Sequence, residues 1–119
     1  MRAVPALLAA LTLAGCGHAE ERRSQPAPRS EPGLRVWAAH GCGSCHSFSP
    51  AGATATIGPN LSHSLVGRSR DYIRESIVAP NAVVAGGGTS IMPEDFAKRI
   101  SKPQLDALVA FIARGSGAR

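Results

Sequence analysis

Apolar residues recur with helical spacing near the C-terminal end of the chain. Four of them lie at positions i, i+3, i+4 and i+7 of one segment: Leu105, Leu108, Val109 and Ile112. This spacing is typical of an amphipathic helix packed on a core. The segment follows Ser101-Lys102-Pro103-Gln104, which has the form of a capping box, and precedes Gly115, which can end a helix. The sequence therefore predicts a helix between Ser101 and Gly115.

Two further helices are predicted closer to the N-terminal end. The first is expected to be capped by Ser30 and to end before Gly41. Its apolar face comprises Leu34, Trp37 and Ala38. The second is expected to begin with Ser69 as its cap. It should stop before Pro80, because proline disfavours the helical conformation in the residue that precedes it.

The segments between these helices carry no regular apolar pattern. Residues 52–59 and 83–93 are predicted to be loops, and no repeat or convincing hairpin is recognisable. Large side chains are scarce in this chain of 119 residues, of which aromatic residues make up only 4%. A small domain with so few bulky residues has little with which to fill its interior, so a bulky cofactor would supply the missing core. The sequence predicts an all-α fold in one small domain.

The N-terminal residues differ in character from the rest. Residues 1–15 hold an apolar stretch that is too short to cross a bilayer comfortably and is typical of a secretory signal peptide. Leu13-Ala14-Gly15-Cys16 resembles the bacterial lipoprotein lipobox, which implies cleavage before Cys16 and a diacylglycerol thioether on its sulfur. Residues 16–31 are polar and interrupted by prolines, which predicts a flexible linker after the lipidated cysteine. The domain itself is expected in residues 32–119.

These features predict an exported protein, anchored by lipid to a membrane on its periplasmic or cell-surface side. An ordinary signal peptide with an incidental cysteine is the alternative.

The run Cys42-Gly43-Ser44-Cys45-His46 carries the most specific chemistry in the chain. Two thiols three positions apart can each add to one vinyl group of a haem. The imidazole of His46 is then held beneath the ring, where it can ligate the iron. This spacing predicts one c-type haem, bound covalently through Cys42 and Cys45.

Three other interpretations of the motif need partners of which the chain has few. A structural zinc site needs four Cys or His ligands, and outside the motif the chain offers Cys16, His18, His40 and His63. A thioredoxin-like redox pair would follow a strand, and no β-branched run precedes Cys42. A plain disulfide would leave the adjacent His46 unexplained.

The domain resembles the small class I cytochromes c over residues 33–112. Gly33 and Trp37 stand where that family places a glycine and an aromatic residue on its first helix. In that family this helix crosses the last helix, here near Leu108 and Phe111. The resemblance implies a small cytochrome c fold, with three to five helices wrapped around one covalent haem.

The resemblance also assigns a role to the loop after the motif. Gly58-Pro59-Asn60-Leu61 is similar to the family's loop in which the proline carbonyl accepts a hydrogen bond from the proximal imidazole. By that resemblance, Pro59 orients His46 and strengthens it as an electron donor. Three further segments look most like the cytochrome c domains fused to some bacterial oxidase subunits: Asp71–Ile77, Pro80-Asn81 and Met92-Pro93. The expected partners are therefore a redox donor and acceptor, such as a respiratory complex or terminal oxidase.

Met92 is expected to be the second axial ligand. It is the only methionine that remains once Met1 is removed, and it ends a glycine-rich loop. A soft thioether suits low-spin haem iron and raises its reduction potential relative to a second histidine. The alternatives are that Met92 only fills core space, or that His63 is the ligand. Ligation by His63 is awkward because its loop follows Pro59 on the proximal side.

Charge changes this picture little. A formal net charge of +5, with few aromatic residues, is too mild to indicate nucleic-acid binding. The basic residues include two groups: Arg68, Arg70 and Arg74, and Lys98, Arg99 and Lys102. They are candidates for pairing with haem propionates, with Arg68 and Tyr72 as expected contacts, or for steering an acidic partner. A solvated surface is the alternative.

With protein ligands on both axial positions, the iron has no open site for a substrate. The sequence therefore predicts an electron carrier rather than an enzyme. One alternative is a haem-based gas sensor or weak peroxidase, in which Met92 leaves the iron and a small molecule binds. The other is a thiol or zinc protein without haem.

Overall fold

The computed structural model describes residues 31–82, 84 and 88–119, and in these residues the chain is mainly helical. Its α-helices are α1 (Pro32–Ala39), α2 (Leu61–Ser64), α3 (Arg70–Val78), α4 (Phe96–Arg99) and α5 (Lys102–Ser116). Short 3₁₀ turns are η2 (Cys42–Ser44), η3 (Ser49–Ala51) and η4 (Pro80–Ala82). Two strands, β1 (Ser47–Phe48) and β2 (Ala53–Thr54), form a small antiparallel pair. The all-α prediction is confirmed apart from this pair.

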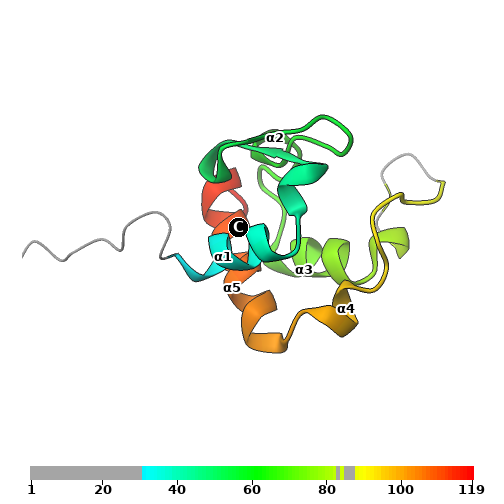
Figure 1. Ribbon diagram of the computed structural model, residues 1–119. Helices are drawn as coiled ribbons and strands as arrows, with labels where there is room; N and C mark the ends of the chain where they lie inside the picture. The colour runs from blue at the N-terminus through cyan, green and yellow to red at the C-terminus, as the bar shows by residue number, and fades with distance from the viewer. Residues whose placement is uncertain (1–30, 83, 85–87) are drawn as a thin grey trace, which may run out of the picture.

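Helices α1 and α5 cross at the centre of the molecule (Figure 1). A Cβ atom on Gly33 would overlap Phe111 Cβ and the Ala107 carbonyl oxygen, so only glycine lets the two helices approach this closely. Trp37 is 4% exposed and its ring lies 6.5 Å from that of Phe111 and 5.3 Å from that of Phe48. The crossing that the family resemblance implied is therefore present, and an aromatic cluster fills the space beside it.

The polar caps position α3 and α5 as predicted. Ser101 Oγ accepts a hydrogen bond from Gln104 N at 3.5 Å, and Gln104 Oε1 accepts one from Ser101 N at 2.9 Å. Ser69 Oγ accepts a hydrogen bond from Tyr72 N at 3.1 Å, and α3 ends at Val78, before Pro80. Each cap satisfies backbone N–H groups that have no partner within the helix.

The predicted end of α5 is wrong. The helix continues through Gly115 to Ser116, and Gly117, with φ of 70°, forms the C-cap instead. Gly115 is required inside the helix because a Cβ there would lie 2.5 Å from both Phe48 Cζ and Pro50 Cγ. Glycine at this position therefore serves close packing rather than helix termination.

The predicted start of α1 also needs correction. Its N-cap is Glu31, which makes no side-chain capping hydrogen bond, and the expected cap Ser30 lies outside the described residues. The Glu31 carboxylate instead accepts a hydrogen bond from Arg114 Nη2 of α5 at 2.7 Å. Glu31, the last residue of the predicted linker, therefore makes an ion pair with α5.

The prediction that residues 52–59 form a loop is only partly correct, because Ala53 and Thr54 form strand β2. Ser47 pairs with Thr54 and Phe48 with Ala53, and Gly52 makes the turn with φ of 64°. Phe48 is fully buried and Ala53 is partly buried against the core, so both strands contribute a side chain to it. Residues 1–30, with the predicted signal peptide and Cys16, and parts of the predicted loop 83–93 lie outside the described residues. No helix in the described part of the chain has the length and apolar character needed to cross a membrane.

Candidate functional site

The Cys42–His46 segment forms one tight turn at the end of α1. Gly41, with φ of 67°, redirects the chain, and the Cys42 carbonyl accepts hydrogen bonds from Cys45 N at 3.3 Å and His46 N at 3.1 Å. A Cβ on Gly43 would lie 3.1 Å from Trp37 Nε1, so the turn rests on the buried indole. Both thiols are free and partly exposed, and the turn presents them beside the imidazole.

Burial raises the pKa of the Cys42 thiol from 9.0 to about 11, against smaller opposing effects of its backbone and of Arg99. The thiol is therefore protonated at neutral pH. A redox-active dithiol needs a lowered pKa on its attacking cysteine, because the thiolate is the nucleophile. The environment of Cys42 disfavours the thioredoxin-like interpretation of the motif.

The imidazole of His46 is oriented by the loop that follows the strand pair. Its Nδ1 lies 2.9 Å from the Pro59 carbonyl oxygen, the contact that the family resemblance predicted. A carbonyl oxygen can only accept, so Nδ1 carries the proton and donates it. The lone pair of the neutral ring is then on Nε2, the nitrogen available to a metal.

Gly58 lets the loop backbone contact this imidazole directly. A Cβ at Gly58 would lie 2.6 Å from His46 Cε1 and 2.8 Å from Nδ1, closer than side chains pack. Gly58 N also donates a hydrogen bond to the Cys45 carbonyl at 2.7 Å. Residues 58 and 59 therefore fix both the turn of the motif and the plane of its histidine.

A second set of hydrogen bonds connects this loop to the strand pair. Asn60 Oδ1 accepts a hydrogen bond from Ser62 N at 2.9 Å and so caps α2. Ser62 Oγ accepts one from Ser49 N at 3.2 Å. No role was predicted for these three side chains, although an asparagine before a short polar helix is a recognisable capping signal.

The structure places the remaining candidate ligands on other elements. Met92 is partly buried and packs against the core, whereas the neighbouring Ile91 is 79% exposed. His63 is exposed on α2, and the His40 ring meets Phe96 edge-on at 6.3 Å. Among the described residues, no three His, Cys, Asp or Glu side chains gather to form a metal site.

Several of the basic residues are paired with acidic side chains. Asp106 accepts hydrogen bonds from Lys102 Nζ at 2.9 Å and Arg74 Nη2 at 2.6 Å, and these two cations hold the pKa of its carboxyl below the ordinary value. Arg99 pairs with Asp95 at 3.0 Å. The two predicted basic groups are thus partly neutralised by the protein itself.

Arg68 and Tyr72, the candidate propionate contacts, lie together. The Arg68 guanidinium is stacked over the Tyr72 ring, 4.8 Å from its centroid. This cation–π contact places a fixed positive charge beside a phenol at the start of α3.

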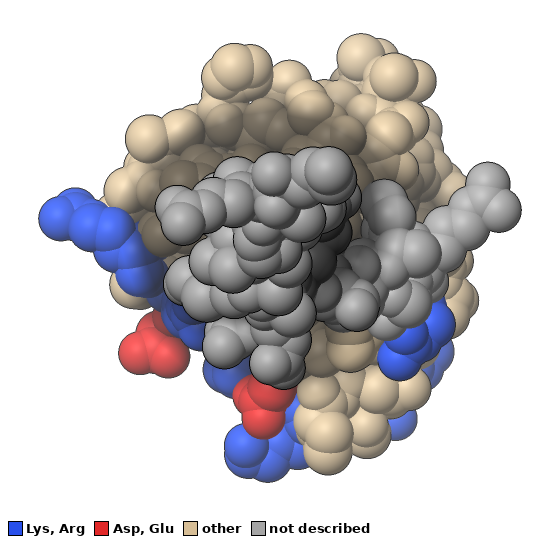
Figure 2. Space-filling model, turned by 90° about the vertical axis from the view of Figure 1, so that its left-hand side faces the viewer, with Lys and Arg blue, Asp and Glu red and all other residues tan. Residues whose placement is uncertain are grey.

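Charge is absent from the segment that carries the motif. Residues 36–67 contain no Lys, Arg, Asp or Glu. In the face shown in Figure 2, charged side chains lie along the sides and lower part, and the visible upper part, which holds α2 and the strands in Figure 1, shows none. Ile57 beside this loop is 64% exposed. The segment that carries the motif therefore contributes no charged side chain to the surface.

Two surface hollows, of ≈ 290 and ≈ 280 Å³, are formed by described residues; Gly43 and Ser44 of the motif line the second, and His46 lines neither.

These donors fit a covalently attached haem. Two unpaired thiols on one turn can form the thioethers, and the imidazole next to them presents a free Nε2. Any residue larger than glycine at position 58 would overlap the imidazole, so the loop backbone contacts the ring directly and holds it rigidly.

Comparison with known proteins agrees with this fit. The family model described as Cytochrome c matches residues 30–116, well over half of the chain. Comparison with curated proteins and with solved structures gave no significant match. The chain therefore belongs to the cytochrome c family, whose members use a covalently bound haem c for electron transfer.

Proposed function

We propose that this protein is an exported, lipid-anchored one-electron carrier whose haem iron is ligated by His46 and Met92. Membership of the cytochrome c family gives the cofactor and the class of activity. The observation that carries the proposal furthest is the hydrogen bond from His46 Nδ1 to the Pro59 carbonyl at 2.9 Å, because it leaves Nε2 as the only donor atom of the ring.

Each residue of the site has a distinct task in this proposal. Haem iron supplies the one-electron couple when it is bound. Cys42 and Cys45 hold the cofactor, and the Pro59 carbonyl makes the His46 imidazole a stronger donor, which favours the oxidised state. A thioether from Met92 acts in the opposite direction and raises the potential. The balance of these two groups sets the potential, and neither leaves a position for a substrate.

The partners are redox proteins, and the uncharged surface of residues 36–67 is where we expect one to approach the cofactor. The proposed partner class remains a respiratory complex or a terminal oxidase, on the resemblance of Asp71–Ile77 and Met92-Pro93 to domains of oxidase subunits. An uncharged contact avoids the cost of desolvating charged groups.

The ligand assignment is tested by optical spectroscopy of protein produced together with haem-maturation machinery. We expect a pyridine haemochrome of the thioether type and a weak far-red sulfur-to-iron band in the oxidised protein. Met92→Ala should abolish the far-red band, and the control His63→Ala should keep it. Survival of the band in Met92→Ala would refute ligation by Met92. Binding of carbon monoxide by the wild-type ferrous protein at neutral pH would favour the sensor or peroxidase alternative.

The anchor is tested separately. Residues 1–15 are proposed to be removed and Cys16 to carry the lipid. The mature protein should therefore fractionate with membranes and have the mass of a chain that begins at a lipidated Cys16. Cys16→Ser should release the protein or leave it unprocessed. A wild-type protein found entirely in the soluble fraction would contradict the anchor while leaving the haem site unaffected.

A further inference from the structure

Two hydrogen bonds connect the Met92 segment to the turn after α3. Asn81 lies in η4, and its Oδ1 accepts a hydrogen bond from Ser90 N at 2.8 Å. Ser90 Oγ in turn accepts one from Met92 N at 3.0 Å. A continuous path therefore runs from the Asn81 side chain through Ser90 to the backbone of the proposed ligand.

Few hydrogen bonds hold this segment. Residues 88–94 contain neither helix nor strand, and among the described residues these two hydrogen bonds are the ones that involve the segment. Ile91 is 79% exposed, so it contributes no packing that would fix its neighbour. Apart from the partial burial of the Met92 side chain, the position of the Met92 backbone therefore depends on Asn81 and Ser90.

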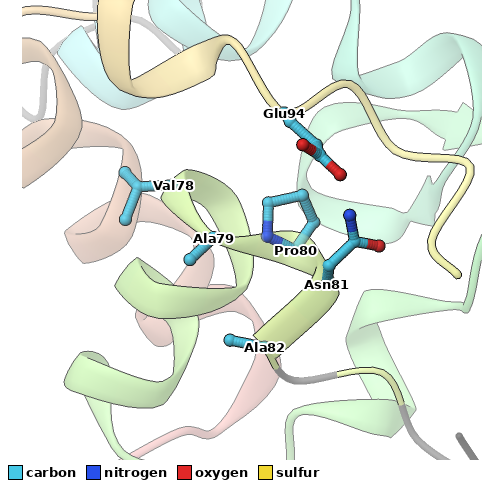
Figure 3. A pocket seen from close by; sticks show the side chains of 6 residues that line it. All are labelled: Val78, Ala79, Pro80, Asn81, Ala82 and Glu94. Atoms are coloured by element: carbon cyan, nitrogen blue, oxygen red, sulfur yellow. The ribbon is translucent and has the colours of Figure 1, made fainter.

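The other end of the path is firmly anchored. Pro80 is buried, and Ile73 and Ile77 of α3 are 2% and 7% exposed where this helix packs on α5. Figure 3 shows the Asn81 side chain projecting from η4 with its polar end facing Glu94 across a hollow of ≈ 290 Å³. Asn81 is therefore a polar group that a rigid element presents to an irregular one.

We propose that Asn81, acting through Ser90, is a positioning residue for Met92. By fixing the Met92 backbone, it increases the fraction of molecules in which the thioether is bound to iron. This inference rests on the proposed function, because it takes Met92 to be the ligand.

The expected effect follows from the strength of one neutral hydrogen bond, which changes an equilibrium by about threefold to fivefold. An external ligand can bind the iron only in molecules from which Met92 has dissociated. Its apparent affinity therefore rises in proportion to that fraction. Loss of either hydrogen bond should raise the apparent affinity by about the same three- to fivefold factor.

The test is an imidazole titration of the ferric holoprotein. Asn81→Ala and Ser90→Ala should each bind imidazole about three- to fivefold more tightly than the wild type. As the pH is raised, the far-red band of each variant should disappear at a lower pH than that of the wild type. Ser90→Thr keeps the hydroxyl and should behave as the wild type. Glu94→Gln alters the same hollow without touching the path and should also leave the affinity unchanged. Wild-type affinity in both alanine variants would overturn the inference.

A double-mutant comparison distinguishes this outcome from failure of the ligand assignment. In a Met92→Ala background the iron position opposite His46 is always open, so adding Asn81→Ala should produce no further change in imidazole affinity. If Asn81→Ala raised the imidazole affinity equally in that background and in the wild type, the effect would be a general structural one, and the positioning role would be overturned. If Met92→Ala alone binds imidazole as weakly as the wild type, the ligand assignment fails instead. Should Asn81→Ala not fold, Ser90→Ala carries the same test.

Discussion

Gly58→Ala should displace the proximal histidine without introducing a polar or charged group. The new Cβ would lie 2.6 Å from His46 Cε1 and 2.8 Å from Nδ1, whereas ordinary contacts begin at 3.4 Å. The two groups must therefore separate by about 0.8 Å, because repulsion rises steeply below the contact distance. The backbone at Gly58 has no positive φ, so this steric effect is the whole cost of the substitution.

Either response to the added methyl group weakens the site. If the ring moves, the 2.9 Å hydrogen bond from His46 to Pro59 is stretched. If the loop moves, the 2.7 Å hydrogen bond from Gly58 N to Cys45 is stretched instead. Overpacking of about 1–3 kcal/mol and loss of about 1 kcal/mol for one hydrogen bond give a destabilisation of roughly 2–4 kcal/mol.

The reduction potential should change in a predictable direction. A weaker hydrogen bond to Pro59 makes His46 a poorer donor and favours the reduced state. If that bond favours the oxidised state by about 0.5–1 kcal/mol, the midpoint potential rises by roughly 20–45 mV. Urea unfolding and a redox titration of the holoprotein measure the two effects.

Gly52→Ala is the matched control for this experiment. Gly52 has φ of 64° but nothing within 4 Å of an added Cβ, so alanine should cost about 1 kcal/mol in strain and leave the potential unchanged. A Gly58→Ala protein with wild-type stability and potential would show that the loop does not fix the histidine as described.

Three further substitutions or conditions test other parts of the structure. Gly33→Ala should lower the free energy of unfolding by about 2–3 kcal/mol, because its Cβ would overlap Phe111 and separate the two central helices; unchanged stability in urea would show that their close approach is dispensable. Asp106→Asn should lower stability at neutral pH. Since the pKa of Asp106 is lowered on folding, its contribution is present above the ordinary value of 3.8 and disappears as pH falls through the folded value; a variant that kept the wild-type dependence of stability on pH in acid would argue against this. The rate of electron exchange with a redox partner that approaches the uncharged surface of residues 36–67 should change less than about threefold between low and physiological salt. A tenfold fall in that rate would place the docking site on the basic residues instead.

Helix starts could be predicted where a local signal determines them. The capping box of Ser101 and Gln104 and the cap at Ser69 each involve residues three positions apart, so the sequence contains the whole interaction. The end of α5 could not be predicted in the same way. Gly115 is determined by its contact with Phe48, and no local pattern indicates a contact between residues so far apart in the chain.

The site shows the same division. The spacing of Cys42, Cys45 and His46 is a local pattern, and the role of Pro59 followed from resemblance to a family. The strand pair was missed because each strand has only two residues, too few for an alternating pattern. Polar residues are common in loops, so no pattern in the sequence connects Asn81 with Ser90.

The two proposed axial ligands are held by different means, and this difference bears on the choice between carrier and sensor. His46 is held by direct backbone contact at Gly58 and by a hydrogen bond to its ring, within a segment tied to the strand pair. Met92 is partly buried against the core, and its backbone is held by a hydrogen bond to Ser90, which in turn is bound to Asn81, in a segment without helix or strand. Any ligand exchange should therefore occur on the Met92 side, where a hydrogen bond changes the bound fraction by about threefold to fivefold. A gas sensor needs that side to open readily, whereas a carrier needs it to stay closed in both oxidation states. The path from Asn81 to Met92 favours the closed state, and so it supports the carrier.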